Sequence, residues 1–297
     1  MFTATHILSD RFKKEKSPDS ALTKEEAAHL LAAYIRYVKK PTLIIGENVY
    51  DYIVEEKAEN NTKWTSSPAN GHASVHRQLT IWGFDALFRD QSSSITNLSG
   101  KFSPTAKSYI YAGSVEPDID EVDKMTINNK KVKTYLGHYC SPQLKNKFNT
   151  SDPTAYTRFN AHYYNAITIY DWGDYETAYN ELGRALHYLE DITSPPHAAL
   201  IEGTRHSEYE DYARDRVLSS SKLLTTIPSS TYSYMKTTRG EDMCRSFATV
   251  SNNYAYIVDL GVSDVNKKAG TKECLHKAQR IVAGLGYRYL EDTERLW

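Results

Sequence analysis

The sequence predicts an all-α protein, a multi-helix bundle in which long loops carry many of the side chains suited to bind a ligand. Apolar residues recur at helical spacing in three long segments, 155–171, 174–192 and 272–292. Residues 113–153 have many turn residues and few periodic apolar positions, which is typical of long loops. Long ordered loops on a helical scaffold often carry function, so this stretch is a candidate for part of a site.

The N-terminal part is predicted to form an extension, residues 1–63, distinct from a main domain at 64–297. A capping box beginning at Thr23 predicts a helix that continues to about Lys40 with an amphipathic apolar stripe. The polar run 59–63 interrupts the pattern and places the boundary.

The main domain is predicted to open with a helix at 76–90 that has a thick apolar face. The Ser-rich stretch 91–107 is expected to be a loop. Trp82 and Trp172 lie on helical faces and are predicted to belong to the core. The remaining helices follow the long loops, so the ligand-rich segments are expected at one end of the bundle or between its helices.

Composition excludes several broad classes of protein. The 297 residues include 36 basic and 37 acidic side chains, so no polycationic surface for nucleic acid is expected. No apolar stretch approaches the roughly 20 residues that a membrane-spanning helix needs. The three cysteines form no CxxC pair, and at most one disulfide is possible, with Cys244 and Cys274 as candidates. Three free thiols are the preferred interpretation.

The most informative motif combines histidines and carboxylates between positions 187 and 210. His187 and Asp191 are four residues apart on a predicted helix, so both side chains project from one face. Two prolines then break the helix before His197, and His206 and Glu210 repeat the same spacing. Imidazole and carboxylate are ligands that zinc prefers, and two such pairs close together predict a cluster of ions.

Several segments, in order, make the chain resemble the bacterial zinc-dependent phospholipases C, which share a helical fold with the S1/P1 nucleases. The resemblance runs from Trp64 to about Leu290. The segments that carry it are Val75–Ile81, Gly113–Asp120, Leu136–Tyr139, Gly173–Ala198 and Lys277–Gly284. The resemblance implies that residues 64–297 form a helical catalytic domain that binds two to three zinc ions.

The resemblance also implies which residues hold each ion. One ion would be bound by Asp118, His138, His187 and Asp191. A second would be bound by His197, His206 and Glu210. The third would use His76, with Asp191 as a bridge and with the amino nitrogen and carbonyl oxygen of an N-terminal tryptophan.

Trp64 is the residue that would supply those last two ligand atoms. It lies twelve residues before His76, close to the family's separation, and follows Lys63 in a polar segment open to proteolysis. Residues 1–63 therefore resemble a removable propeptide that keeps the enzyme latent as a zymogen. The alternative is that Trp64 is an ordinary aromatic residue in an uncleaved chain.

Two residues receive roles beyond metal binding. Asp118 is the candidate for orienting or deprotonating the attacking water. Tyr135 corresponds to an aromatic residue that in the family lies against the choline group, where a cation over an aromatic face has a physical basis, although simple packing is an alternative. His162 and His276 lie outside the matching segments and are expected to take no part in the site.

The activity that the resemblance implies is hydrolysis of glycerophospholipids to diacylglycerol and a phosphorylated headgroup. The expected partner is phospholipid at a membrane surface. The protein is expected to be a secreted monomer, although residues 1–10 contain no apolar export signal. One alternative is a single-strand nuclease of the same fold, which the near-zero net charge disfavours. A second alternative is a non-catalytic, zinc-stabilised helical domain that binds lipid. Ser67 and Ile119 depart from the family's headgroup contacts and leave the headgroup open.

Overall fold

The computed structural model describes residues 74–90, 101–127, 130–219, 225–259 and 262–293, with only the backbone described at 125–127, 130–132 and 216–219. These residues belong to one compact unit. The predicted helix beginning at Thr23, Trp64 and the boundary at 63 lie outside the described residues, so the extension remains a prediction.

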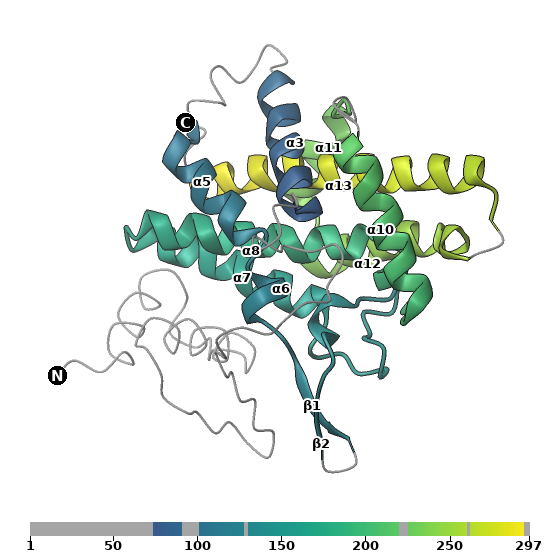
Figure 1. Ribbon diagram of the computed structural model, residues 1–297. Coiled ribbons are helices and arrows are strands. Elements are labelled where there is room, and N and C mark those ends of the chain that lie inside the picture. The colour runs from purple at the N-terminus through teal and green to yellow at the C-terminus, as the bar shows by residue number, and fades with distance from the viewer. Residues whose placement is uncertain (1–73, 91–100, 128–129, 220–224, 260–261, 294–297) are drawn as a thin grey trace. The chain divides into compact units, whose positions relative to one another are not determined.

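Helices dominate the described residues, which confirms the all-α prediction. The α-helices are α3 (Val75–Arg89), α5 (Pro104–Gly113), α6 (Pro117–Asp120), α7 (Ala155–Asp171), α8 (Tyr175–Thr193), α9 (Pro195–Ala198), α10 (Thr204–Ser219), α11 (Ser229–Thr237), α12 (Gly240–Asn252) and α13 (Asp264–Asp292). Two 3₁₀ turns, η2 (Leu136–His138) and η3 (Ala255–Val258), and one antiparallel hairpin, β1 (Lys124–Ile127) with β2 (Lys130–Lys133), complete the set. The hairpin projects away from the helices in Figure 1.

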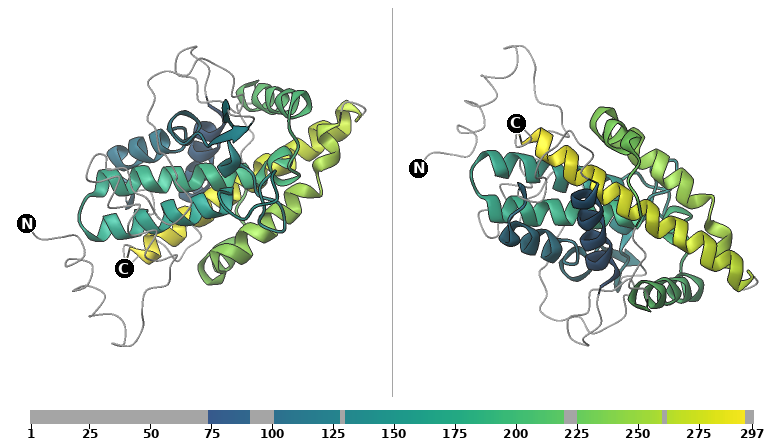
Figure 2. Two further views of the ribbon diagram at one scale, coloured as in Figure 1. Left: turned by 90° about the horizontal axis from the view of Figure 1, so that it is seen from below. Right: turned by 90° about the horizontal axis from the view of Figure 1, so that it is seen from above.

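Helix α8 lies at the centre of the packing. It runs beside α7 and also contacts α5, α12 and α13, while α3 crosses α13 (Figures 1 and 2). Its first turn is capped by Asp174, whose side chain accepts a hydrogen bond from the backbone N–H of Thr177. From Leu182 to Thr193 only Arg184 is not fully buried, so polar side chains on this helix are held inside the protein.

Two glycines bring α5 and α8 unusually close together. A Cβ atom on Gly113 would lie 2.1 Å from the backbone oxygen of Asn180, and one on Gly183 would lie 2.2 Å from that of Ile110. Only residues without a side chain allow this backbone contact. The contact places the chain that leaves α5, including α6, directly against the middle of α8.

Two clusters of buried apolar residues support the fold. The larger joins α3, α5, α7, α8, α12 and α13, with Phe84, Ile110, Leu182 and Tyr289 among its members. The smaller surrounds Leu79 on α3 and includes residues of α10, η3 and α13. Helix α8 is therefore packed on several sides, and its side chains are held rigidly.

Several local predictions require correction. Helix α5 begins at Pro104, inside the predicted loop 91–107, because Ser103 caps it and proline suits a first helical turn. The last helix begins at Asp264, eight residues earlier than predicted. Trp172 is 43% exposed because it caps the end of α7 at a turn, so its assignment to the core was wrong. The three cysteines are buried free thiols.

Candidate metal centre

Helix α8 supplies the central pair of the site. His187 and Asp191 are both fully buried, and the Nε2 atom of His187 lies 3.3 Å from Oδ2 of Asp191. The i, i+4 spacing places both side chains on one face, as the sequence predicted. The rigid packing of α8 fixes this pair before any ligand is added.

Two short elements bring further ligands to the same point. Asp118 comes from the single turn α6, and its Oδ1 lies 3.6 Å from Nε2 of His187. His138 comes from η2, and its Nδ1 lies 2.8 Å from Oδ2 of Asp191 and 3.7 Å from Oδ1 of Asp118. Tyr135 precedes η2 in a left-handed conformation, with φ of 49°, which turns the chain toward the site.

A second group forms where α9 meets α10. Pro195 and its neighbour start α9, which presents His197 beside the i, i+4 pair of α10. The Nε2 atom of His197 lies 3.1 Å from Oε1 of Glu210 and 3.2 Å from Nε2 of His206. The Nε2 atom of His206 lies 2.6 Å from Oε1 of Glu210. Three potential ligand atoms thus converge on one point.

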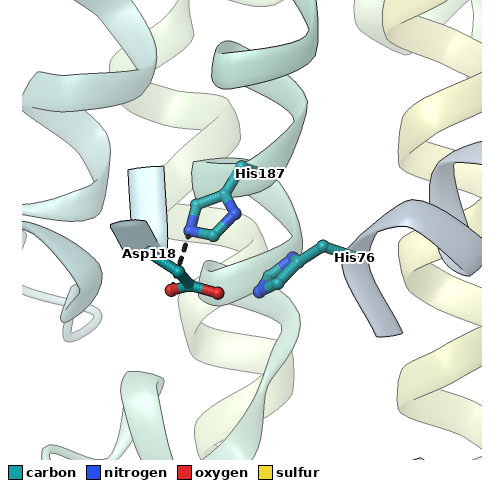
Figure 3. Close-up of side chains that lie close together, drawn as sticks. All are labelled: His76, Asp118 and His187. Atoms are coloured by element: carbon teal, nitrogen blue, oxygen red, sulfur yellow. Dashed lines mark ion pairs between the residues drawn. The ribbon is translucent and has the colours of Figure 1, made fainter. Parts of the chain in front are cut away.

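His76 approaches from α3 on the other side of His187 (Figure 3). Its ring centroid lies 3.9 Å from that of His187, and its Nε2 lies 3.6 Å from Oδ1 of Asp191. Its Nδ1 lies 2.7 Å from Oε2 of Glu190, whose other oxygen accepts a hydrogen bond from the Thr80 hydroxyl at 2.9 Å. A buried carboxylate therefore sets the orientation of this imidazole.

Hydrogen bonds to the outer nitrogens orient the other histidines. The Nδ1 of His187 lies 2.9 Å from the backbone oxygen of Ser114, that of His197 2.9 Å from the oxygen of His138, and that of His206 2.8 Å from the oxygen of Ile201. A carbonyl oxygen only accepts, so each Nδ1 donates, and Nε2 is the nitrogen of each ring that can bind a metal once it is deprotonated. His138 differs, because its Nδ1 faces the site.

The central carboxylate is built to remain ionised. Burial would raise the pKa of Asp191, but the histidines at 197, 187 and 138 hold it well below its usual value. Burial opposes the charged form of the histidines too, yet Asp191 raises the pKa of His187 to about 9 and that of His197 to about 10. The pKa of Glu210 is lowered to about 2, because the charge of His206 and the hydrogen bonds from His197 and His206 outweigh the effect of burial. Without metal, protons therefore occupy this site.

The donor set fits divalent zinc. Three groups of ligand atoms could each hold an ion among the described residues: His76, Asp118 and His187; His138, His187 and Asp191; and His197, His206 and Glu210. Nε2 of His138 is buried and has no hydrogen-bond partner among the described residues. Five imidazoles and three carboxylates, mostly buried, form a site that metal cations would neutralise and bridge.

The structure brings together every predicted metal ligand that it describes. Asp191 lies within 3.6 Å of a nitrogen of His76, His138, His187 and His197, a position suited to the bridging role inferred for it. The grouping of His76 with Asp118 and His187 differs from the predicted third ion, which would rely on Trp64, a residue outside the described part.

Sequence reasoning missed the residues behind the ligands. Glu190 directly follows an apolar position and precedes a ligand, but no spacing rule indicated that it would meet His76 from a different helix. His162, which was expected to take no part in the site, belongs to none of the ligand groups found among the described residues, but it is buried between Glu181 and Glu121 at 2.8 and 3.0 Å. These contacts join α7, α8 and the segment after α6, so only the tertiary structure shows them.

Comparisons with known proteins agree with this geometry. The family described as zinc-dependent phospholipase C matches residues 75–260, more than half of the chain. A phospholipase C of Clostridium perfringens is 27% identical over 204 residues, covering 61% of this chain and 48% of that protein. A phospholipase C of Listeria monocytogenes is 25% identical over 169 residues, covering 54% of this chain and 55% of that protein. The chain spans about half the length of these curated relatives.

Solved structures share the fold. The alpha toxin of Clostridium absonum superimposes with a TM-score of 0.63 at 20% identity, covering 74% of this chain and 63% of the toxin. The alpha-toxin of an avian strain of Clostridium perfringens gives 0.63 at 23% identity, covering 77% and 66%. On the family match, together with this fold and this set of ligands, the chain belongs to the zinc-dependent phospholipase C family.

Proposed function

We propose that this protein is a zinc-dependent phospholipase C that cleaves glycerophospholipids to diacylglycerol and a phosphorylated headgroup. The observation that carries the proposal is the convergence of five histidines and three carboxylates into overlapping ligand groups. The match to the family model over residues 75–260 supports the same activity.

The residues are suited to phosphodiester hydrolysis. Bound zinc would supply a Lewis acid for the phosphate oxygens and would lower the pKa of water to near neutrality. Asp118 is the most accessible of the carboxylates, with its side chain 11% exposed compared with 1% for Asp191 and 8% for Glu210. Burial raises the pKa of Asp118 above its usual value, which favours a role in accepting a proton from the attacking water.

We propose two to three zinc ions. The groups around Asp191 and around Glu210 support two ions from described residues alone. A third ion would use His76 with the amino nitrogen of Trp64. An amino nitrogen that is part of a peptide bond has no lone pair for a metal, so this third site needs cleavage after Lys63.

Substrate binding is assigned to Tyr135, which lies beside the candidate ligand His138. The ring of Tyr135 is partly buried and lies 5.9 Å from the ring of His138, between centroids. Burial and the charge of Asp118 raise the pKa of Tyr135, so its ring stays neutral beside the centre. We propose that it contacts the headgroup, and that a secreted monomer acts on phospholipid at a membrane surface without a stable nucleic-acid partner. No described helix is long and apolar enough to cross a bilayer.

The test combines metal analysis with substrate hydrolysis. Purified protein should contain two to three zinc ions, and it should release diacylglycerol from phosphatidylcholine or phosphatidylethanolamine vesicles but leave single-stranded DNA intact. Less than one zinc per chain would overturn the metal assignment. Faster hydrolysis of DNA would favour the nuclease, and intact zinc without turnover of either substrate would favour a lipid-binding domain.

The role of residues 1–63 requires a separate comparison. The full chain and a form that begins at Trp64 should be measured side by side for zinc content and vesicle hydrolysis. Latency predicts one additional zinc and higher activity in the shorter form. Equal values would mean that the extension is a permanent part of the protein.

A further inference from the structure

Arg184 lies on α8, one turn before the metal ligand His187, and its side chain points to the segment that carries Asp118. We propose that Arg184 is a positioning residue that holds Asp118 in its place in the metal centre. The kinetic test of this inference rests on the proposed function, whereas the zinc content, the cobalt spectrum and the melting temperature do not depend on it. Among the described residues, the ion pairs of Glu116 and Asp120 are both made with Arg184.

The guanidinium contacts three carboxylates that surround Asp118 in the sequence. Its Nη2 donates to Glu116 at 2.7 Å and to Oδ2 of Asp120 at 2.5 Å. Its Nη1 donates to Oδ1 of Asp120 at 2.9 Å and to Glu121 at 2.6 Å. The contact with Asp120 is therefore two-pronged, a geometry that arginine forms and lysine cannot reproduce.

The guanidinium is itself fixed. Its Nε donates to the side-chain oxygen of Asn180 at 3.1 Å, and the Asn180 amide donates to Glu116 at 2.9 Å. The Arg184 side chain is 12% exposed, and burial would lower its pKa, but the three carboxylates raise it instead. A well-ordered, permanently charged group on a rigid helix is thus available to hold the facing segment.

The segment needs such a contact. Helix α6 is a single turn without a side-chain N-cap bond, too short to be stable from its own hydrogen bonds. Four carboxylates, Glu116, Asp118, Asp120 and Glu121, lie within six residues. Their mutual repulsion would favour a looser arrangement unless a cation lies between them.

The positions of Asp118 and His187 relative to each other are both set by contacts with the same part of α8. The backbone oxygen of Ser114 accepts a hydrogen bond from Nδ1 of His187 at 2.9 Å, and Arg184 holds the residues on either side of Asp118. The separation between Oδ1 of Asp118 and Nε2 of His187, 3.6 Å, is therefore set within one turn of one helix. Loss of Arg184 would move Asp118 and leave His187 in place.

Glu121 extends the attachment into the protein interior. Its Oε2 accepts a hydrogen bond from the Tyr188 hydroxyl at 3.0 Å and lies 3.0 Å from Nε2 of His162 and 3.5 Å from Nη1 of Arg158. Glu121 would thus keep partners without Arg184, whereas Glu116 and Asp120 would lose their cation. We expect the damage to be local to α6.

The experiment compares Arg184→Lys and Arg184→Gln with Arg245→Gln as a control. Arg245 also pairs with a carboxylate one helical turn away, Glu241, but its side chain is 46% exposed and belongs to α12. For each protein we would measure zinc content, the absorption spectrum of the cobalt-substituted form, the melting temperature, and kcat and KM on phosphatidylcholine vesicles.

Both Arg184 variants should change the cobalt spectrum in the same direction as Asp118→Asn, and kcat should fall by about 10- to 100-fold, as for other residues that orient metal ligands, with KM within about twofold. The Arg245 variant should match the wild type. If the Arg184 variants only melt at a lower temperature, and keep the wild-type spectrum and kcat below that temperature, the positioning role is wrong.

A variant that does not depend on removal of the arginine is Asp120→Asn. Its side chain is 37% exposed, so the fold should tolerate it. It should shift the cobalt spectrum less than Arg184→Lys does. The shift in the double variant, Asp120→Asn with Arg184→Lys, should be smaller than the sum of the two single shifts, because both substitutions break the contact between Arg184 and Asp120. Full additivity would overturn the proposal. If the wild type hydrolyses no phospholipid while these spectral changes appear, the proposed function fails and the positioning role stands.

Discussion

Binding of zinc to the metal-free protein should release about two protons at pH 7.5. The pKa of His187 is raised to about 9 and that of His197 to about 10, so both imidazoles are more than ~95% protonated at that pH. A metal binds only the unprotonated nitrogen, so both protons must leave. Asp191 and Glu210 release none, because their pKa values are lowered and they are already ionised.

Proton release determines how zinc affinity depends on pH. If two protons are released, the apparent affinity for filling the ligand groups of His187 and His197 together should rise by ~100-fold for each pH unit between about 6.8 and 8.3. Titration calorimetry in buffers of different ionisation enthalpy gives the number of protons directly, and chelator competition gives the affinity. His276→Gln serves as the control, because His276 lies outside the centre and the number should not change.

A zinc affinity that does not change with pH, with less than about half a proton released, would refute this account of the site.

The same protonated pairs also stabilise the metal-free fold. Because the folded pKa values of His187 and His197 exceed the ordinary value of 6.5, their contribution is complete below about 6.5 and is lost as pH rises through about 9 and about 10. The melting temperature of the metal-free protein should therefore fall between pH 7 and 10.5, and saturating zinc should remove most of that dependence.

Three substitutions test individual roles. Asp191→Asn should lower zinc content by at least one ion and abolish most activity, because a bridging carboxylate serves two ions. Substitution of the exposed Asp259 by Asn is the control. Wild-type zinc content in the Asp191 variant would contradict the bridging role. Glu190→Gln should weaken zinc binding by about 10- to 100-fold, since the amide orients His76 without the carboxylate charge; unchanged affinity would show that the contact is not needed. Tyr135→Ala should reduce turnover of choline lipid more than that of ethanolamine lipid, and an equal loss would indicate packing.

Much of the centre follows from sequence alone because its ligands sit at helical spacing. An i, i+4 pair projects from one face whatever the rest of the protein does, so His187 with Asp191 and His206 with Glu210 could be paired without a structure. The resemblance to the family then named His76, Asp118 and His138 in segments distant from the motif. Trp64 stays a prediction, because it lies outside the described residues.

Other features depended on the meeting of elements that are far apart in the chain. Glu190 contacts a histidine 114 residues away, and Arg184 contacts carboxylates more than 60 residues away. No local periodicity encodes such contacts. They arise because Gly113 and Gly183 allow α5 and α8 to touch, and because the crossing of α3 brings His76 to the buried face of α8.

The sequence by itself determined the helical class, and it predicted the pairs of histidine and carboxylate and zinc as the metal, because these depend on residue type and on spacing within one helix. The tertiary structure decided which nitrogen of each histidine faces the centre, which ligand groups overlap, and which charges hold them. Those properties depend on hydrogen bonds to groups such as the backbone oxygens of Ser114 and Ile201, whose positions are fixed only when the helices pack.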